Sequence, residues 1–216
     1  MQIGTLDASD MAEAVDVIKR GMLDNPTHVA ALGKDPDVRR RRVHRIFSKV
    51  LPITGNPLIA ARGTDGTILG LLGMAAPGTC QLAVPQKMLV TGGLLPLGPR
   101  AMFRSLQWVG TWSKLDRPAP HWHLGPVAVD SHLQGNGVGS KLMTVFCAQM
   151  DAAAADAYLE TDKPENVRFY QRFGFEVTGG QDVIGVPNWF MLRPAGAGSS
   201  DDIPQRPLAR RKSHRP

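Results

Sequence analysis

The stretch HLQGNGVGSKLM, residues 132–143, decides how the second half of this chain is interpreted. Gly135, Gly137 and Gly139 stand at alternate positions, and a helix-like apolar pattern follows them at once. Glycines that open a helix leave backbone N–H groups exposed at the positive end of the helix dipole, where anions bind. The stretch therefore predicts a backbone site for an anion: a nucleotide triphosphate, a dinucleotide or the pyrophosphate of another coenzyme.

The spacing of the glycines distinguishes between binding sites for these three anions. A triphosphate-binding P-loop needs G-x-x-x-x-G-K-[ST], but Ser140 stands between Gly139 and Lys141. A dinucleotide-binding fold approximates the observed glycine spacing but needs several further βα units. Only 56 residues follow Glu160, at the end of the next expected strand, so the chain is too short for them. The pyrophosphate of another coenzyme is therefore the favoured anion.

Hydrophobic periodicity and turn residues predict alternating helices and strands around this loop. Helices are expected over 7–23, 36–50, 137–154 and 164–174, with one or two short ones within 86–117. Strands are expected over 57–62, 67–76, 121–130, 157–161, 175–183 and 186–194, the first two as a hairpin. This order predicts a single α/β (α+β) domain whose central sheet mixes strand directions.

The strand expected over 121–130 contains Gly125 and Pro126 in its apolar middle. Proline cannot donate to a strand ladder, so a bulge that splays this strand from one neighbour would reconcile it with a central position. The alternative is that Gly-Pro ends one short strand and begins another. A splayed strand would leave backbone groups of 127–129 free to pair with an extended ligand.

Two motifs resemble those of the GNAT superfamily of N-acetyltransferases. Gln134-x-x-Gly137-x-Gly139 is similar to the family's Q/R-x-x-G-x-G/A motif between a strand and a helix. NVRFYQRFGF, residues 166–175, resembles the family's Asn…Phe-Tyr-x-x-x-Gly-Phe segment. The resemblance runs over about 122–193. The sequences around the two motifs look most like those of antibiotic-modifying members such as puromycin N-acetyltransferase.

The resemblance implies a GNAT-like fold and an enzyme that moves the acetyl group of acetyl-CoA to an amine by direct attack. Tyr170 stands at the position of the family's general acid, and Glu160 and His123 are candidates for the base, with Glu160 favoured. The expected cofactor-binding residues are Val127, Ala128, Val129, Gln134, Gly135, Asn136, Gly137, Val138, Gly139, Ser140, Asn166, Phe169 and Arg172. Asn136 departs from the family, because many relatives carry Arg or Lys there; Lys141, Arg168 and Arg172 are nearby cations that would compensate.

The acceptor is left open by the motifs. A small-molecule amine is expected, and Trp108 and Trp112 in the apolar segment 86–117 favour an apolar or aromatic one if they wall a pocket rather than pack in the core. The basic run Arg39–Arg42 is expected to be a solvated helix face, which would also repel a polycation. The competing function is a catalytically silent acyl-CoA-binding or regulatory domain.

Bulk properties bound these expectations. The 216 residues favour one domain, about 1–195, followed by a disordered basic tail over 196–216 with five basic and two acidic residues. That tail supplies +3 of the net charge of +6, so nucleic acid is not an expected partner. The two distant cysteines favour the reducing cytoplasm. The polar N-terminus and the interrupted apolar run favour a protein without a signal peptide or membrane span. A monomer or a homodimer is expected. The histidines show no metal spacing, and no metal is expected.

Overall fold

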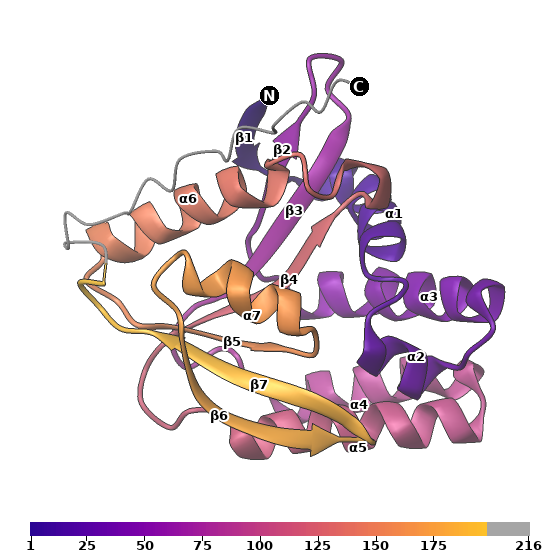
Figure 1. Ribbon diagram of the computed structural model, residues 1–216. Coiled ribbons are helices and arrows are strands. Elements are labelled where there is room, and N and C mark those ends of the chain that lie inside the picture. Colours follow the sequence, from indigo (N-terminus) through magenta and orange to yellow (C-terminus); the bar gives the residue numbers. More distant parts are fainter. Residues whose placement is uncertain (198–216) are drawn as a thin grey trace, which may run out of the picture.

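A seven-stranded sheet in the order β1-β2-β3-β4-β5-β7-β6 forms the centre of the computed structural model, which describes residues 1–197 (Figure 1). Neighbouring strands are antiparallel except β4 and β5, which are parallel. The strands are β1 (Gln2–Thr5), β2 (Leu58–Arg62), β3 (Ile68–Ala75), β4 (Trp122–Val129), β5 (Ala157–Thr161), β6 (Glu176–Val183) and β7 (Val186–Arg193).

Helices cover both faces of this sheet and bury a separate apolar core against each. The helices are α1 (Met11–Gly21), α2 (Pro26–Leu32), α3 (Pro36–Thr54), α4 (Val84–Leu94), α5 (Pro99–Leu115), α6 (Val138–Ala152) and α7 (Pro164–Gln171). One core joins α1 to α5 with alternate residues of β2 and β3, and the other joins α6 and α7 with the opposite residues of the same strands. Figure 1 shows α2, α4 and α5 gathered at the end of the molecule toward which β6 and β7 extend. Within residues 1–197, no helix combines the length and the apolarity that crossing a bilayer requires.

The predicted fold class is confirmed, and several element boundaries are corrected. The helix expected over 7–23 is a 3-10 turn at Ala8–Asp10 followed by α1. The sequence missed β1, an edge strand of four residues, and α2, a short helix between two loops. Helix α3 continues to Thr54 instead of 50, and α4 and α5 are longer than the short helices expected within 86–117. The disordered tail expected from residue 196 lies outside the described residues, apart from its first two.

The register between β3 and β4 confirms a bulge at Gly125-Pro126. Leu124 pairs with Met74 and Val127 pairs with Leu72, so two residues of β4, Gly125 and Pro126, oppose the single residue Gly73 of β3. All four side chains of the two pairs belong to or pack against the core beneath α6, although 124 and 127 would face opposite sides of a regular strand. The bulge therefore resets the alternation of β4 in its middle.

Beyond the bulge, β4 and β5 separate. Their parallel pairing is confined to Trp122 with Ala157 and His123 with Tyr158. Val127 and the residues after it pair with β3 alone, among the described residues. The sheet is therefore continuous on one side of β4 and open on the other, as the splayed-strand interpretation predicted.

The C-terminal end of α1 packs directly on the end of β4. Arg20 Nε donates to Asp130 Oδ2 at 2.6 Å, and a Cβ on Gly21 would overlap the carbonyl oxygen of Val129. Glycine is required at this position because only it allows the helix backbone to come so close. The contact sets α1 and the loop after it beside the open edge of β4.

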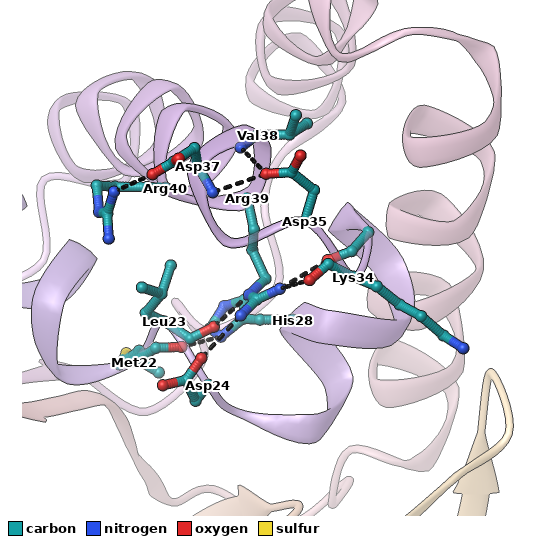
Figure 2. A network of polar contacts seen from close by, with 11 residues as sticks. Met22, Leu23, Asp24, His28, Lys34, Asp35, Asp37, Val38, Arg39 and Arg40 are labelled. Atoms are coloured by element: carbon teal, nitrogen blue, oxygen red, sulfur yellow. Dashed lines mark hydrogen bonds and ion pairs between the residues drawn. The ribbon is translucent and has the colours of Figure 1, made fainter.

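The loops that flank α2 are held by one buried side chain, Arg39 of α3 (Figure 2). Its guanidinium donates to the carbonyl oxygens of Leu23 at 2.7 Å, Gly33 at 2.9 Å and Lys34 at 2.9 Å, and to Asp24 Oδ1 at 2.7 Å. The expected solvated face over Arg39–Arg42 is therefore wrong at its first residue, whose exposure is 4%. Helix periodicity turns this arginine inward, where loop carbonyls that lack partners need a donor.

We expect Arg39→Ala to lower the free energy of unfolding by at least about 2 kcal/mol, because three loop carbonyls lose their donor. Arg40 is the matched control, because it neighbours Arg39 on α3, is exposed, and within residues 1–197 pairs only with Asp37 one turn away. Arg40→Ala should change stability by about 0.5 kcal/mol or less. Urea denaturation of both variants measures the difference, and equal losses would contradict a structural role for the buried guanidinium.

Candidate active site

The glycine loop forms the N-terminus of α6, as the sequence predicted. Gly135 and Gly137 have φ angles of 83° and 82°, in the region that L-residues with side chains rarely adopt. No side chain caps the helix at Gly137, so the N–H groups of its first turn have no intrahelical partner. A cavity of about 320 Å³ lies over these N–H groups. The loop therefore offers uncompensated donors and the positive end of a helix dipole to an anion in that cavity.

The open edge of β4 forms another wall of the same cavity. Asp130 N–H donates to Leu69 O of β3, and backbone groups on a strand alternate in direction, so Ala128 also points toward β3. The N–H groups of Val127 and Val129 then point to the open side, and both residues line the cavity. These two N–H groups and the carbonyl oxygen of Val127 face a ligand that lies along β4, whereas the carbonyl oxygen of Val129 already accepts from Gln134 Nε2 at 3.2 Å.

Most of the expected cofactor-binding residues line this cavity. They are Val127, Val129, Gln134, Gly135, Gly137, Gly139, Ser140, Asn166, Phe169 and Arg172. Three others do not line it. Ala128 turns its backbone to β3 and its side chain into the core under α1, the side chain of Val138 is buried in the core under α6, and Asn136 is exposed outside the cavity. Of the compensating cations, Arg172 lines the cavity, whereas Lys141 and Arg168 do not.

The sequence missed a set of cavity residues that come from other parts of the chain. Gly21, Met22 and Asn25 reach the cavity from the end of α1, and Lys163 reaches it from the loop before α7. None belongs to a motif, and nothing in their local pattern distinguishes them from ordinary loop residues. Only Lys163 could have been predicted from the sequence. It directly precedes the helix with the segment 166–175, so its cation could have been expected near the ligand that this segment binds.

A second cavity of about 230 Å³ adjoins the first on the side of β5. Five residues line both cavities: Met22, Asn25, Val127, Asn166 and Tyr170. The remaining lining residues include His28, Phe47, Trp108, Trp112, His123, Glu160 and Asp162. The two cavities therefore meet at the bulge of β4, with the three proposed acid–base residues at or beyond the junction.

Tyr170 is the polar aromatic side chain at that junction. Its ring packs against Phe169 and Phe175, and the residue is 7% exposed. Burial, with a smaller contribution from the Asp162 carboxylate, raises the pKa of Tyr170 above its ordinary value of 10. Among residues 1–197 its hydroxyl has no hydrogen-bond partner. The phenol is therefore protonated at neutral pH and free to donate to a ligand.

His123 and Glu160 form a pair beside the junction. His123 Nε2 lies 2.9 Å from Glu160 Oε2, and the Glu160 side chain is 3% exposed. Burial lowers the pKa of His123, but the charge of Glu160, hydrogen bonds with Cys80 and Glu160 and the charge of Asp116 together outweigh burial and raise the pKa. The Glu160 carboxylate and the His123 imidazole both line the second cavity.

An aromatic wall closes the second cavity. His28 of α2 contacts Trp108 edge to face at 5.1 Å between ring centroids, and Trp108 contacts Trp112 in the same way at 5.2 Å. Helix α2 is positioned by Asp162, whose Oδ2 accepts from Thr27 N–H at 2.7 Å. The two tryptophans thus line a pocket, the first of the two roles left open by the sequence.

Known proteins were compared with the chain. Residues 100–175 match the model of the Acetyltransferase (GNAT) family. The fold is similar to that of histone acetyltransferase HPA2 and related acetyltransferase from Corynebacterium glutamicum, with a TM-score of 0.69, 22% identity, and coverage of 90% of this chain and 96% of that one. The family match spans the glycine loop and the segment 166–175, and the solved structure shares the fold.

Two further solved structures have the same fold. Phosphinothricin acetyltransferase from Sinorhizobium meliloti, in complex with AcCoA, has a TM-score of 0.54 at 15% identity, with 93% of this chain and 91% of that one covered. Arylalkylamine N-acetyltransferase 2 from Aedes aegypti has a TM-score of 0.55 at 12% identity, with 90% and 98% covered. The predicted GNAT-like domain is confirmed as a fold, and the comparisons do not single out a puromycin N-acetyltransferase subtype.

The buried imidazole of His28 gives the stability of the protein a pH dependence. Burial lowers the pKa of His28 from its ordinary 6.5 to about 4, although the Asp162 carboxylate opposes the shift. The unfolded chain therefore binds a proton first as the pH falls, and the stability present above pH 6.5 is lost progressively toward pH 4.

We expect about 2 kcal/mol of this loss between pH 7 and pH 5, and His28→Gln should remove it. Urea unfolding of the variant at the two pH values provides the measurement. His44→Gln is the control, because His44 is exposed on α3 and should keep the wild-type dependence. An unchanged dependence in the His28 variant would refute the assignment.

Proposed function

We propose that the protein is an N-acetyltransferase that moves the acetyl group of acetyl-CoA to an amine of a small molecule. One observation carries the proposal: Tyr170 lines both cavities, at the place where they meet. A phenol in that position lies between a site for the cofactor and a site for an acceptor. A protein that only binds acyl-CoA needs no proton donor there, so the silent alternative is not favoured.

The first cavity suits a coenzyme A thioester. Its pyrophosphate would accept from the N–H groups of the glycine loop and the first turn of α6, with Arg172 and Lys163 as further cations. Its pantetheine arm would pair with the outward backbone groups of Val127 and Val129, as an added strand does. That path leads the thioester to the junction beside Tyr170. A phosphinothricin acetyltransferase of similar fold was solved in complex with AcCoA, which supports acetyl-CoA as the ligand to test.

The reaction follows from this placement as a direct transfer. The neutral amine attacks the thioester carbonyl carbon, a C–N bond forms and the C–S bond breaks. A strand N–H of Val127 or Val129 stabilises the oxygen as negative charge develops on it. The amine proton passes to Glu160, directly or through water, and Tyr170 gives its hydroxyl proton to the departing sulfur. The products are an amide and the coenzyme A thiol.

The second cavity indicates the class of acceptor. Its wall holds the rings of Phe47, Trp108 and Trp112, and His28 is neutral at physiological pH because burial lowers its pKa to about 4. Such a wall favours an amine carried on an apolar or aromatic body, and it offers a poor site for a polycation. Antibiotic-like amines therefore belong among the acceptors to be tested. The two free cysteines suit a reducing compartment, and we place the enzyme in the cytoplasm.

Acetyl-CoA should raise the melting temperature, because a ligand that binds only the folded state stabilises it. Gly137→Trp should abolish this shift, since Gly137 lines the cavity at a positive φ and the indole would fill the space over the loop. Gly66→Trp is the matched control, because Gly66 also has a positive φ and open surroundings, at the tip of the β2–β3 hairpin. An acetyl-CoA shift that survives in the Gly137 variant and equals that of the control would place the cofactor elsewhere.

Turnover decides between the enzyme and the silent binder. Purified protein is incubated with acetyl-CoA and a library of amines, and release of free thiol is followed. We expect thiol release with amines on apolar or aromatic bodies and little with polyamines. Binding of acetyl-CoA without thiol release across the library would favour the acyl-CoA-binding alternative.

With an acceptor in hand, Tyr170→Phe should reduce kcat and kcat/KM alike by about a hundredfold, the usual scale for a positioned acid. The acetyl-CoA dissociation constant should change little, because the hydroxyl interacts mainly with charge that develops on sulfur. Tyr158→Phe is the matched control, since its hydroxyl donates to Leu115 O and lines neither cavity. Near-normal turnover in the Tyr170 variant, with lowered stability, would reduce that residue to a core aromatic.

A further inference from the structure

Four potential metal ligands converge beside the acceptor cavity, on segments that the sequence keeps apart. Cys80 follows β3, Asp116 follows α5, and His121 and His123 lie at the start of β4. One ligand atom from each lies within 4.8 Å of all the others. The expectation of no metal rested on spacing, and 36 positions separate Cys80 from Asp116.

The distances within this cluster resemble those of a tetrahedral ion's ligands. His121 Nε2 lies 3.2 Å from Asp116 Oδ1, His123 Nδ1 lies 3.9 Å from the same oxygen, and Cys80 Sγ lies 3.3 Å from Asp116 Oδ2. Ligands about 2.0–2.3 Å from a tetrahedral zinc ion are about 3.3–3.7 Å apart. Small side-chain movements would bring all four atoms to that separation.

Three of the four ligand groups have buried polar atoms without a hydrogen-bond partner. They are Asp116 Oδ1, His121 Nε2 and His123 Nδ1, as found among the described residues. The side chains of His121 and Asp116 are 3% and 9% exposed. A buried polar atom without a partner is costly, and one shared partner would satisfy all three of these atoms, which face one another.

The other nitrogen of each imidazole is already engaged. His121 Nδ1 lies 2.8 Å from the carbonyl oxygen of Ala119, which can only accept, so Nδ1 carries the hydrogen and Nε2 presents a lone pair to the cluster. His123 Nε2 faces the Glu160 carboxylate at 2.9 Å, which leaves Nδ1 for the cluster. Histidines that bind metals are oriented in this way, by a carbonyl or carboxylate on the second nitrogen.

We propose that Cys80, Asp116, His121 and His123 bind a zinc ion as a closed four-ligand site. A thiolate and a carboxylate would balance the charge of the ion, and sulfur with imidazole nitrogen is a donor set that zinc prefers. Cys80 loses its thiol proton to solvent on binding. Gln81 Nε2 holds the other Asp116 oxygen at 2.6 Å, and a surface cavity of about 580 Å³ lined by Cys80, Asp116 and His121 gives the ion access.

The site would act on the α4–α5 segment. Cys80 and Asp116 bracket that segment at its two ends, and both histidines belong to the central strand region. One ion would therefore fasten both ends of the segment that carries Trp108 and Trp112 to β4.

The full-length protein, stripped with a chelator, tests the site without any activity measurement. Zinc should bind with a stoichiometry of about one, by metal analysis after dialysis, and should raise the melting temperature by several degrees. Cobalt(II) should bind in its place and give the visible bands of a tetrahedral ion together with a thiolate-to-cobalt charge-transfer band. The chain has two cysteines, so the band must arise from Cys80 or Cys147.

Variants assign that band. Cys147→Ala should keep it, because Cys147 is a buried residue of α6 and lies outside the cluster, whereas Cys80→Ala should abolish it. His121→Gln should weaken zinc binding at least tenfold, and His44→Gln should leave it unchanged. If Cys80→Ala fails to fold, the wild type and Cys147→Ala still decide, because a band retained without Cys147 comes from Cys80.

Two results would overturn the proposal. No retained zinc and no zinc-dependent rise in melting temperature would mean that protons, not an ion, occupy the cluster. Cobalt that binds without a thiolate band, or with a band lost in Cys147→Ala, would mean that the ion binds elsewhere. Either result leaves the acetyl-transfer proposal intact, because none of these readouts depends on acetyl-CoA.

Discussion

The separation of β4 from β5 beyond His123 is the constraint on which the candidate site depends. A sheet whose central strands paired along their whole length would leave no backbone donors for a ligand and no space between its layers. Proline at 126 removes one N–H from the strand, and the bulge around it resets the side-chain alternation of β4. The outward backbone groups of Val127 and Val129 and the meeting point of two cavities both follow from this opening.

The opening needs support from both faces of the sheet. Helix α6 brings the N–H groups of its first turn to one end of it, and α1 comes against Val129 at the same end through Gly21. On the side of β5, α2 is held by Asp162 and by the loops that Arg39 organises, so that His28 reaches the acceptor cavity. Arg39, which is far from either motif, and Asp162, which stands just before the second one, therefore shape the pocket, because they fix loops whose own sequences specify little.

The two cavities of the site differ in the charges and dipoles that line them. The cofactor side has helix-terminal N–H groups and cations, which suit phosphate. The acceptor side has aromatic rings, a neutral imidazole and one carboxylate paired with His123, which suit an amine that must lose a proton. The proposed zinc cluster adjoins this second side through His123, and it would stiffen the wall of the acceptor cavity without taking part in the chemistry.

The sequence by itself determined the elements whose signals are local. The spacing of the glycines predicted the anion loop, apolar periodicity predicted α6 and α7, and Gly125-Pro126 predicted the bulge. These features are predictable because neighbouring residues set backbone conformation and the faces of a helix. Tertiary structure alone decided what depends on residues distant in sequence. Arg39 was expected in solvent and is buried. The reason is that only the packing of α2 on α3 brings the loop carbonyl groups to its guanidinium. The acceptor wall and the Cys80–His123 cluster were equally invisible, because each gathers side chains from separate segments whose contact exists only once the chain has folded.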